Sequence, residues 1–295
     1  MSEPAAAPVR LAASLEGPAG APVLVLGNSL GTSCAVWEPQ RAVLRRHFRL
    51  LRYEHRGHGS AASAAAAGTE SGAGATGEGA SPGRSPALPG PYTIAELGAD
   101  VLALLDSRGI GRAMYCGASL GGMIGMWLAA SAPERITALG LCCTSANLPP
   151  ADLWAGRAGQ ARSGEMGALA GQIVGRWFTP AFQAREPEVP AAFAAVLRAT
   201  DPEGYAACCE AIAAMDLRPV LARITAPTLV ISAAEDPATP PWHGAVIASG
   251  ISGARLAVIR GAAHLANVSV PGQVTDALLD HLRDAAEGRG RKAES

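Results

Sequence analysis

Short, almost wholly apolar runs recur along this chain, and segments with helical periodicity separate them. We predict buried strands at residues 22–27, 48–53, 113–116, 136–143, 227–232 and 255–259. The clearest helix is 93–108, where Thr93 and Glu96 form a capping box ahead of an apolar stripe. Strands that are apolar on both faces need cover on both sides, and strands joined by helices run parallel. The sequence therefore predicts an open, doubly wound α/β fold with a mostly parallel sheet.

The length and charge of the chain narrow the classes of function. At about 150 residues per domain, 295 residues allow one large domain or two small ones. The 24 basic and 25 acidic side chains give a net charge of -1, which argues against a nucleic-acid-binding protein. Apolar runs stay below the roughly 18 residues of a membrane helix, and the amino terminus lacks the pattern of a secretory signal. We expect a cytoplasmic protein that binds neither nucleic acid nor membrane.

The six cysteines indicate neither a zinc site nor a disulfide framework. They are Cys34, Cys116, Cys142, Cys143, Cys208 and Cys209. None forms a C-x-x-C pair, and neighbouring residues of a strand point to opposite faces. We therefore predict small buried thiols in a reducing compartment and no bound metal.

Two stretches break the alternation of strands and helices. Residues 60–91 are rich in Ala, Gly, Ser and Pro, and Leu88 is their one large apolar side chain. Such a segment cannot offset its ordering entropy by burial, so we interpret it as a flexible surface insertion. Residues 145–216 are helical in character and rich in aromatic side chains, namely Trp154, Trp177, Phe178, Phe182, Phe193 and Tyr205. We predict a helical cap at 145–216 on a core formed by 1–144 and 217–295.

The pattern G-x-S-x-G marks a serine on a sharp turn between a strand and a helix, and it occurs three times. In a chain so rich in glycine the pattern alone is weak, and context must choose among Ser29, Ser81 and Ser119. Ser81 has no strand before it, and the strand before Ser29 comes too early. Ser119 lies between a predicted strand and an apolar helix, and Gly117 and Gly121 relieve the crowding of such a turn. We predict Ser119 as a nucleophile.

A serine hydroxyl needs a base to take its proton, and that base needs an acid to orient it. On a fold of this kind the acid follows a later strand and the histidine follows the last one. Glu235 and Asp236 follow the strand 227–232, and His264 follows the strand 255–259. We favour Asp236 over Glu235, because Pro237 next to it suits a turn that presents a short carboxylate.

Attack on a carbonyl also requires donors aimed at the developing oxyanion. One is the main-chain amide of Leu120, which follows the nucleophile at the start of a helix. The second should come from the loop after an early strand, and we assign it to the amide of Leu30.

Several longer segments together carry a family resemblance. They are LGNSLGTSCAVWEPQ, FRLLRYEHRGHG, PYTIAELGADVLALLD, YCGASLGGMIGMWLA, RWFTPAF, YAACCEAIAAMDLR, ISAAEDPATPP and AAHLANV. They are similar to segments of the 3-oxoadipate enol-lactonases of the β-ketoadipate pathway, which belong to the α/β-hydrolase superfamily. Three features depart from that pattern: the 60–91 insertion, Glu54 and His55 before Arg56, and Ala118 beside the nucleophile.

The resemblance implies an α/β-hydrolase fold and a triad of Ser119, Asp236 and His264. It also implies that the cap contacts the substrate, and we take Trp154 as the candidate wall. The implied substrate is a small five-membered enol lactone with an acetate arm, hydrolysed to 3-oxoadipate without a metal or an organic cofactor.

A buried carboxylate on that substrate needs a cation or N–H donors. Arg157, one helical turn from Trp154, has the spacing to provide one. Arg162 and Arg176 remain open as alternatives.

Two other hypotheses use the same fold. One is a general carboxylesterase or a cofactor-free perhydrolase with the same triad. The other is a non-enzymatic ligand-binding protein, against which the complete set of serine, acid and histidine argues.

Overall fold

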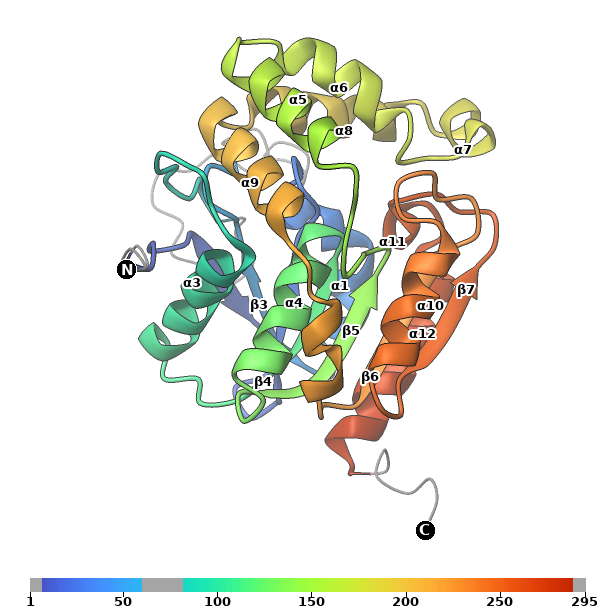
Figure 1. Cartoon of the computed structure of the whole chain (residues 1–295). Helices are drawn as coiled ribbons and strands as arrows, with labels where there is room; N and C mark the ends of the chain where they lie inside the picture. The colour runs from blue at the N-terminus through green and yellow to red at the C-terminus, as the bar shows by residue number, and fades with distance from the viewer. Residues whose placement is uncertain (1–6, 60–81, 289–295) are drawn as a thin grey trace, which may run out of the picture.

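A computed structural model describes residues 7–59 and 82–288 of the chain. Its centre is one seven-stranded sheet with the order β1-β3-β2-β4-β5-β6-β7 (Figure 1). The strands are β1 (Ala13–Glu16), β2 (Val23–Gly27), β3 (Arg49–Tyr53), β4 (Ala113–Ala118), β5 (Ile136–Cys142), β6 (Thr228–Ala233) and β7 (Arg255–Ile259). All neighbours pair in parallel except β1, which runs antiparallel to β3 at the edge. The predicted sheet is confirmed. Strand β1 escaped prediction because it is only half-buried and lacks a continuous apolar run.

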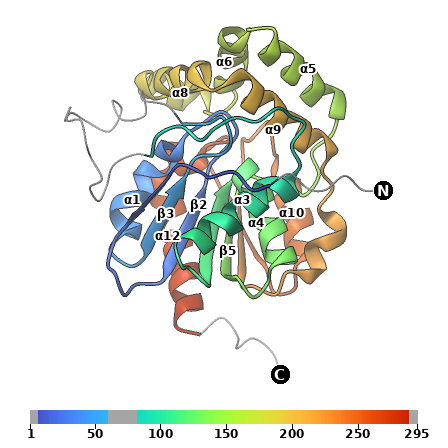
Figure 2. The same cartoon turned by 90° about the vertical axis from the view of Figure 1, so that its left-hand side faces the viewer.

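Helices cover both faces of this sheet, as the apolar strands require. Figure 2 shows α1 and α12 on one side and α3, α4 and α10 on the other. The helical elements of the core are η1 (Cys34–Trp37), α1 (Glu38–Leu44), α3 (Ile94–Ser107), α4 (Leu120–Ser131), η2 (Arg218–Arg223), α10 (Pro241–Gly250), α11 (Ala266–Ser269) and α12 (Pro271–Ala286). The predicted capping box begins α3, since Thr93 Oγ accepts from the Glu96 amide at 3.1 Å and the Glu96 carboxylate accepts from the Thr93 amide at 2.8 Å.

A second layer of helices lies over the carboxyl ends of the strands (Figure 1). It is formed by α5 (Ala151–Arg162), α6 (Met166–Val174), α7 (Pro180–Arg185), α8 (Glu188–Ala199) and α9 (Pro202–Ala214). The chain enters this layer after β5 and returns to the sheet at β6. These helices occupy the stretch 145–216 that we interpret as a cap.

Part of the segment that we interpret as a flexible surface insertion, residues 60–91, is held in place by hydrogen bonds. Residues 60–81 lie outside the described residues. Residues 82–91, which we expected to belong to a flexible insertion, make fixed contacts instead. Ser85 is fully buried, donates its hydroxyl to the Glu54 carbonyl at 2.8 Å and accepts from the Ala12 amide at 2.8 Å. Composition does not reveal this anchor, because Ser85 is held by main-chain partners and not by the burial of a large apolar side chain.

All six cysteines are free and buried, as predicted. Among the helices of the described segments, none has both the length and the apolar character needed to cross a bilayer.

Candidate active site

Ser119 lies on the turn where β4 passes into α4. Its backbone has φ 50° and ψ -111°, a conformation that residues with a side chain seldom adopt. A Cβ on Gly117 would lie 2.2 Å from the backbone of Gly121, and a Cβ on Gly121 would lie 2.4 Å from the backbone of Gly27. Both flanking positions therefore require glycine. The turn presents the Ser119 hydroxyl at the carboxyl edge of the sheet, beneath the cap.

Three side chains from distant parts of the chain form a hydrogen-bonded relay at this edge. The hydroxyl of Ser119 lies 2.9 Å from Nε2 of His264, in the position to donate to it. On the other side of the ring, Nδ1 of His264 donates to Oδ2 of Asp236 at 2.8 Å. The structure thus brings together the serine, histidine and aspartate that the sequence singled out. This arrangement can remove the hydroxyl proton and stabilise the imidazolium that results.

Asp236 is held in a tight turn after β6. Its Oδ1 accepts from the amides of Ala238 and Thr239, and its Oδ2 accepts from the Thr239 hydroxyl at 2.7 Å. Burial by itself would raise the pKa of Asp236, but the charge of His264 and the hydrogen bonds from His264 and Thr239 lower it to about 2. The alternative, Glu235, is exposed. Sequence reasoning missed the Thr239 hydroxyl; the turn at Asp236 and Pro237 signals main-chain donors to the aspartate but no side-chain donor.

The loop after β2 meets the turn after β4. The amide of Gly121 donates to the Asn28 carbonyl at 2.9 Å, which holds the two segments together. The Ser29 carbonyl accepts from both the amide and the hydroxyl of Thr32, at 3.1 and 2.7 Å. The Ser29 carbonyl and the Leu30 N–H belong to the same trans peptide group, in which the C=O and the N–H point in opposite directions. By holding the Ser29 carbonyl, Thr32 therefore also fixes the direction of the Leu30 N–H. Among the described residues, no main-chain acceptor takes a hydrogen bond from that amide or from the Leu120 amide.

A small cavity opens above the relay. Its lining residues come from the loops of the core and from the cap: Ser29, Leu30, Ser119, Leu148, Trp154, Arg157, Ile173, Arg176, Trp177, Tyr205, Ala238 and His264. The predicted wall residue Trp154 is buried, and its indole N–H donates to the Leu148 carbonyl at 2.9 Å. The Arg157 guanidinium stacks 4.6 Å from the centre of the Trp154 ring. The cavity is mostly apolar with a few polar groups, which is typical of a small-molecule site.

The three candidate arginines have different surroundings. Arg157 lines the cavity, and no ion pair or hydrogen bond to it is found within residues 7–59 and 82–288. Arg176 also lines the cavity and donates to the Pro237 carbonyl at 3.1 Å. Arg162 is not among the residues that line the cavity, and it forms ion pairs with Glu203 and Glu210 at the surface. Two of the three, Arg157 and Arg176, therefore line the same cavity as Ser119.

The remaining histidines of the carboxyl-terminal half do not join the relay. His281 lies on α12 and contacts the Leu139 carbonyl at 3.1 Å. His243 is buried, stacks on the Trp242 ring and lies 2.7 Å from the Ser145 hydroxyl. In the described part of the chain, no group of three or more His, Cys, Asp or Glu side chains is arranged to hold a metal ion.

Comparison with known families identifies this architecture. The family model of the alpha/beta hydrolase fold matches residues 22–269, which include the whole sheet from β2 onward and every residue of the relay. The chain belongs to the α/β-hydrolase family. This α/β hydrolase is 36% identical to 3-oxoadipate enol-lactonase 2 of Acinetobacter baylyi over 255 residues, 86% of each chain. It is 31% identical to 3-oxoadipate enol-lactonase 1 of the same organism over 88% of each chain.

A solved structure agrees with these relatives. The crystal structure of the enol-lactonase from Burkholderia xenovorans LB400 matches this α/β hydrolase with a TM-score of 0.83 and 41% identity, covering 92% of this chain and 96% of that one. The predicted fold and the resemblance to the enol-lactonases are thus confirmed over most of the chain.

Proposed function

We propose that this α/β hydrolase opens 3-oxoadipate enol-lactone to 3-oxoadipate, with Ser119 as nucleophile, His264 as general base and Asp236 as the acid that orients it. The observation that carries the proposal is the pair of contacts at His264, 2.9 Å to the Ser119 hydroxyl and 2.8 Å to Asp236, on the floor of a cavity with a cationic wall. The identity to curated enol-lactonases supports the choice of substrate.

Acylation begins when the Ser119 oxygen attacks the lactone carbonyl carbon and His264 takes the hydroxyl proton. The amides of Leu30 and Leu120 hold the resulting oxyanion. Collapse of this intermediate breaks the ring C–O bond and leaves an acyl-serine. The departing oxygen takes the proton from His264 as an enol, which becomes a ketone. An enolate is a good leaving group, so protonation demands less of His264 than the cleavage of an amide would.

Deacylation repeats these steps with a water molecule as the nucleophile. His264 takes a proton from a water molecule as its oxygen attacks the acyl carbon, and the same two amides hold the second oxyanion. The ester bond to Ser119 then breaks and its oxygen recovers the proton from His264. The new carboxylic acid releases its remaining proton to the solvent, and the product leaves as a carboxylate. Ser119 and His264 end the cycle in their starting protonation states.

The acetate arm of the lactone carries a negative charge that must be paired once the cap covers it. We assign this role to Arg157, because it lines the cavity with Ser119 and Trp154 and is only half-buried by its stack on the indole ring. Arg176 lines the same cavity and is the second donor within reach. A planar guanidinium suits a carboxylate, since it donates two parallel hydrogen bonds.

The decisive experiment is ultraviolet monitoring of 3-oxoadipate enol-lactone loss with the wild-type protein and with Ser119→Ala. We expect rapid loss with the wild type and loss at the background rate of the buffer with the variant. The background rate in both reactions would reject the assignment. A parallel panel of p-nitrophenyl esters addresses the carboxylesterase hypothesis, which predicts broad ester turnover and poor turnover of the lactone.

A further inference from the structure

The loop that carries the Leu30 amide is held from behind by the segment that follows β3. His55 Nε2 donates to the Asn28 carbonyl at 2.8 Å, and His58 Nε2 accepts from the Gly31 amide at 3.0 Å. These contacts lie on either side of Leu30, one before it and one after it. Neither imidazole lines the cavity above Ser119. Both histidines are buried, so their contacts cannot be exchanged for water.

The contacts of His58 define its protonation state. Its Nδ1 lies 2.8 Å from the Arg56 carbonyl, which can only accept, so Nδ1 carries the proton. Its Nε2 faces the N–H of Gly31, which can only donate, so Nε2 must present a lone pair. Burial lowers the pKa of His58 to about 4, against a smaller opposing effect of the hydrogen bond to Arg56. The ring is therefore neutral and restricted to one tautomer.

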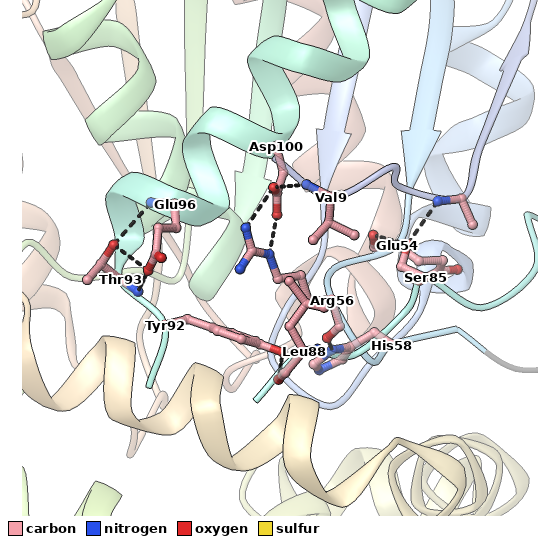
Figure 3. Close-up of polar contacts among 11 residues, drawn as sticks. Val9, Glu54, Arg56, His58, Ser85, Leu88, Tyr92, Thr93, Glu96 and Asp100 are labelled. Carbon is pink, nitrogen blue, oxygen red and sulfur yellow. Dashed lines mark hydrogen bonds and ion pairs between the residues drawn. The ribbon is translucent and has the colours of Figure 1, made fainter. Parts of the chain in front are cut away.

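Rigid contacts hold His58 at this point. Arg56 donates to Asp100 through Nε at 2.6 Å and Nη2 at 2.8 Å, and its guanidinium stacks 4.9 Å from the centre of the Tyr92 ring. Asp100 also accepts from the Val9 amide at 2.7 Å (Figure 3). These bonds fix the Arg56 carbonyl to which His58 donates. The main chain of His58 is fixed as well, because its carbonyl accepts from the Ser85 amide at 3.0 Å.

We propose that His58 is a positioning residue for hydrolysis, because its neutral imidazole holds the Leu30–Gly31 peptide and so keeps the Leu30 amide directed at the oxyanion. Thr32 fixes the peptide before Leu30 and His58 fixes the peptide after it, so the Leu30 residue is held at both ends. Gly31 adopts φ +71°, and because glycine has no side chain its backbone can also adopt other conformations. The hydrogen bond from its amide to His58 therefore restricts a peptide that sterics alone would leave free. The inference rests on the proposed function, since it requires that the Leu30 amide stabilises the oxyanion.

Two substitutions separate the two hydrogen bonds of the ring. In His58→Gln the side-chain oxygen reaches the position of Nε2 and can accept from Gly31, whereas the donor to Arg56 is lost. In His58→Asn the shorter amide reaches only the position of Nδ1, so it keeps a donor to Arg56 and loses the acceptor for Gly31. We expect kcat to fall about 10- to 100-fold in His58→Asn and less than about fivefold in His58→Gln, with KM within about twofold in both. If His58 only stabilised the fold, the variant with the lower melting temperature would have the lower kcat, whichever of the two hydrogen bonds it had lost.

Each variant should be assayed with the enol lactone and with p-nitrophenyl acetate. If the wild-type protein hydrolyses only the ester, the proposed lactone function fails while the order of the two variants on the ester still tests His58. His281→Gln is the matched control, because it changes a buried histidine on α12 that contacts the Leu139 carbonyl, far from the oxyanion loop, and should keep wild-type kcat. Equal kcat in the Asn and Gln variants would overturn the proposal.

A measurement on the unaltered protein covers the case in which a variant does not fold. The ¹⁵N NMR shifts of the His58 ring should show a protonated Nδ1 and an unprotonated, hydrogen-bonded Nε2 throughout the neutral pH range. A proton on Nε2 at neutral pH would also overturn the proposal, since Gly31 would then have no acceptor.

Discussion

The imidazole Nε2 of His264 lies 2.9 Å from the hydroxyl of Ser119, although 145 residues separate the two in the sequence. The contact depends on two loops at the same edge of the sheet, one after β4 and one after β7. Parallel strands place all such loops at one edge, which explains how a relay forms from segments that share no local structure.

Replacing Asp236 with asparagine should impair the chemical step without unfolding the protein. In Asp236→Asn the side-chain oxygen is needed by the amides of Ala238 and Thr239, so the NH2 group faces His264 Nδ1 and cannot accept from it. The ring then loses the tautomer and the orientation that Ser119 needs. We expect kcat to fall about 10³- to 10⁴-fold. Glu235→Gln is the matched control and should retain wild-type kcat, because Glu235 is exposed. Comparable losses in the two variants would mean that the acid has been misassigned.

Removing the guanidinium of Arg157 should affect anionic substrates selectively. A charge-assisted hydrogen bond contributes about 1.5–3 kcal/mol, so Arg157→Ala should raise KM for the enol lactone about 10- to 100-fold. KM for neutral p-nitrophenyl acetate should change less than about twofold. Arg162→Ala should alter neither value, because Arg162 is paired with Glu203 and Glu210 away from the cavity. Equal effects on both substrates would exclude Arg157 from carboxylate binding.

A methyl group at position 121 should destabilise the fold. The added Cβ of Gly121→Ala would lie 2.4 Å from the Gly27 carbonyl group, and backbone atoms cannot move aside as a flexible side chain can. We expect a loss of about 3 kcal/mol in the free energy of unfolding, measured by urea denaturation. Gly159→Ala on α5 is the control, because nothing lies within 4 Å of its added Cβ. That substitution should stabilise the protein slightly.

Glu54 should make the stability of the protein depend on pH. Burial raises the pKa of this carboxyl to about 8, well above its value in an unfolded chain. The folded state then binds the proton more tightly than the unfolded state, so the stabilisation is fully present below about pH 4 and is lost as the pH rises through 8. Glu54→Gln should flatten the decline of the melting temperature between pH 5 and about 8. An unchanged slope in this variant would assign the pH dependence to other groups.

Residues 60–81 should be dispensable for folding and catalysis. The described residues on either side contact one another, since the Ser85 amide donates to the His58 carbonyl at 3.0 Å and Arg84 Nε donates to the Gly59 carbonyl at 3.0 Å. A linker of about four glycines can therefore join Gly59 to Pro82. We expect kcat and the melting temperature to stay close to the wild type. A tenfold loss of kcat would show that the deleted residues contribute to the site.

Local patterns in the sequence determined the fold class and most of the elements. The apolar strands, the capping box of Thr93 and Glu96, and the glycines around Ser119 all express restrictions that act over a few residues, so they can be recognised without coordinates. The order of serine, acid and histidine along the chain added the candidates for the relay, because a parallel sheet brings the ends of its strands to one edge.

Only the tertiary structure determined which polar groups meet. The hydroxyl of Thr239 on the Asp236 carboxylate, Ser85 on the Glu54 carbonyl and His58 on the Gly31 amide are contacts of polar side chains, and no periodic pattern marks them. The same holds for Arg157 and Arg162, which lie five residues apart on one helix yet differ in whether acidic side chains of α9 reach them. Sequence periodicity reports which face of an element is buried, whereas the partner of a hydrogen bond depends on how separate elements pack together.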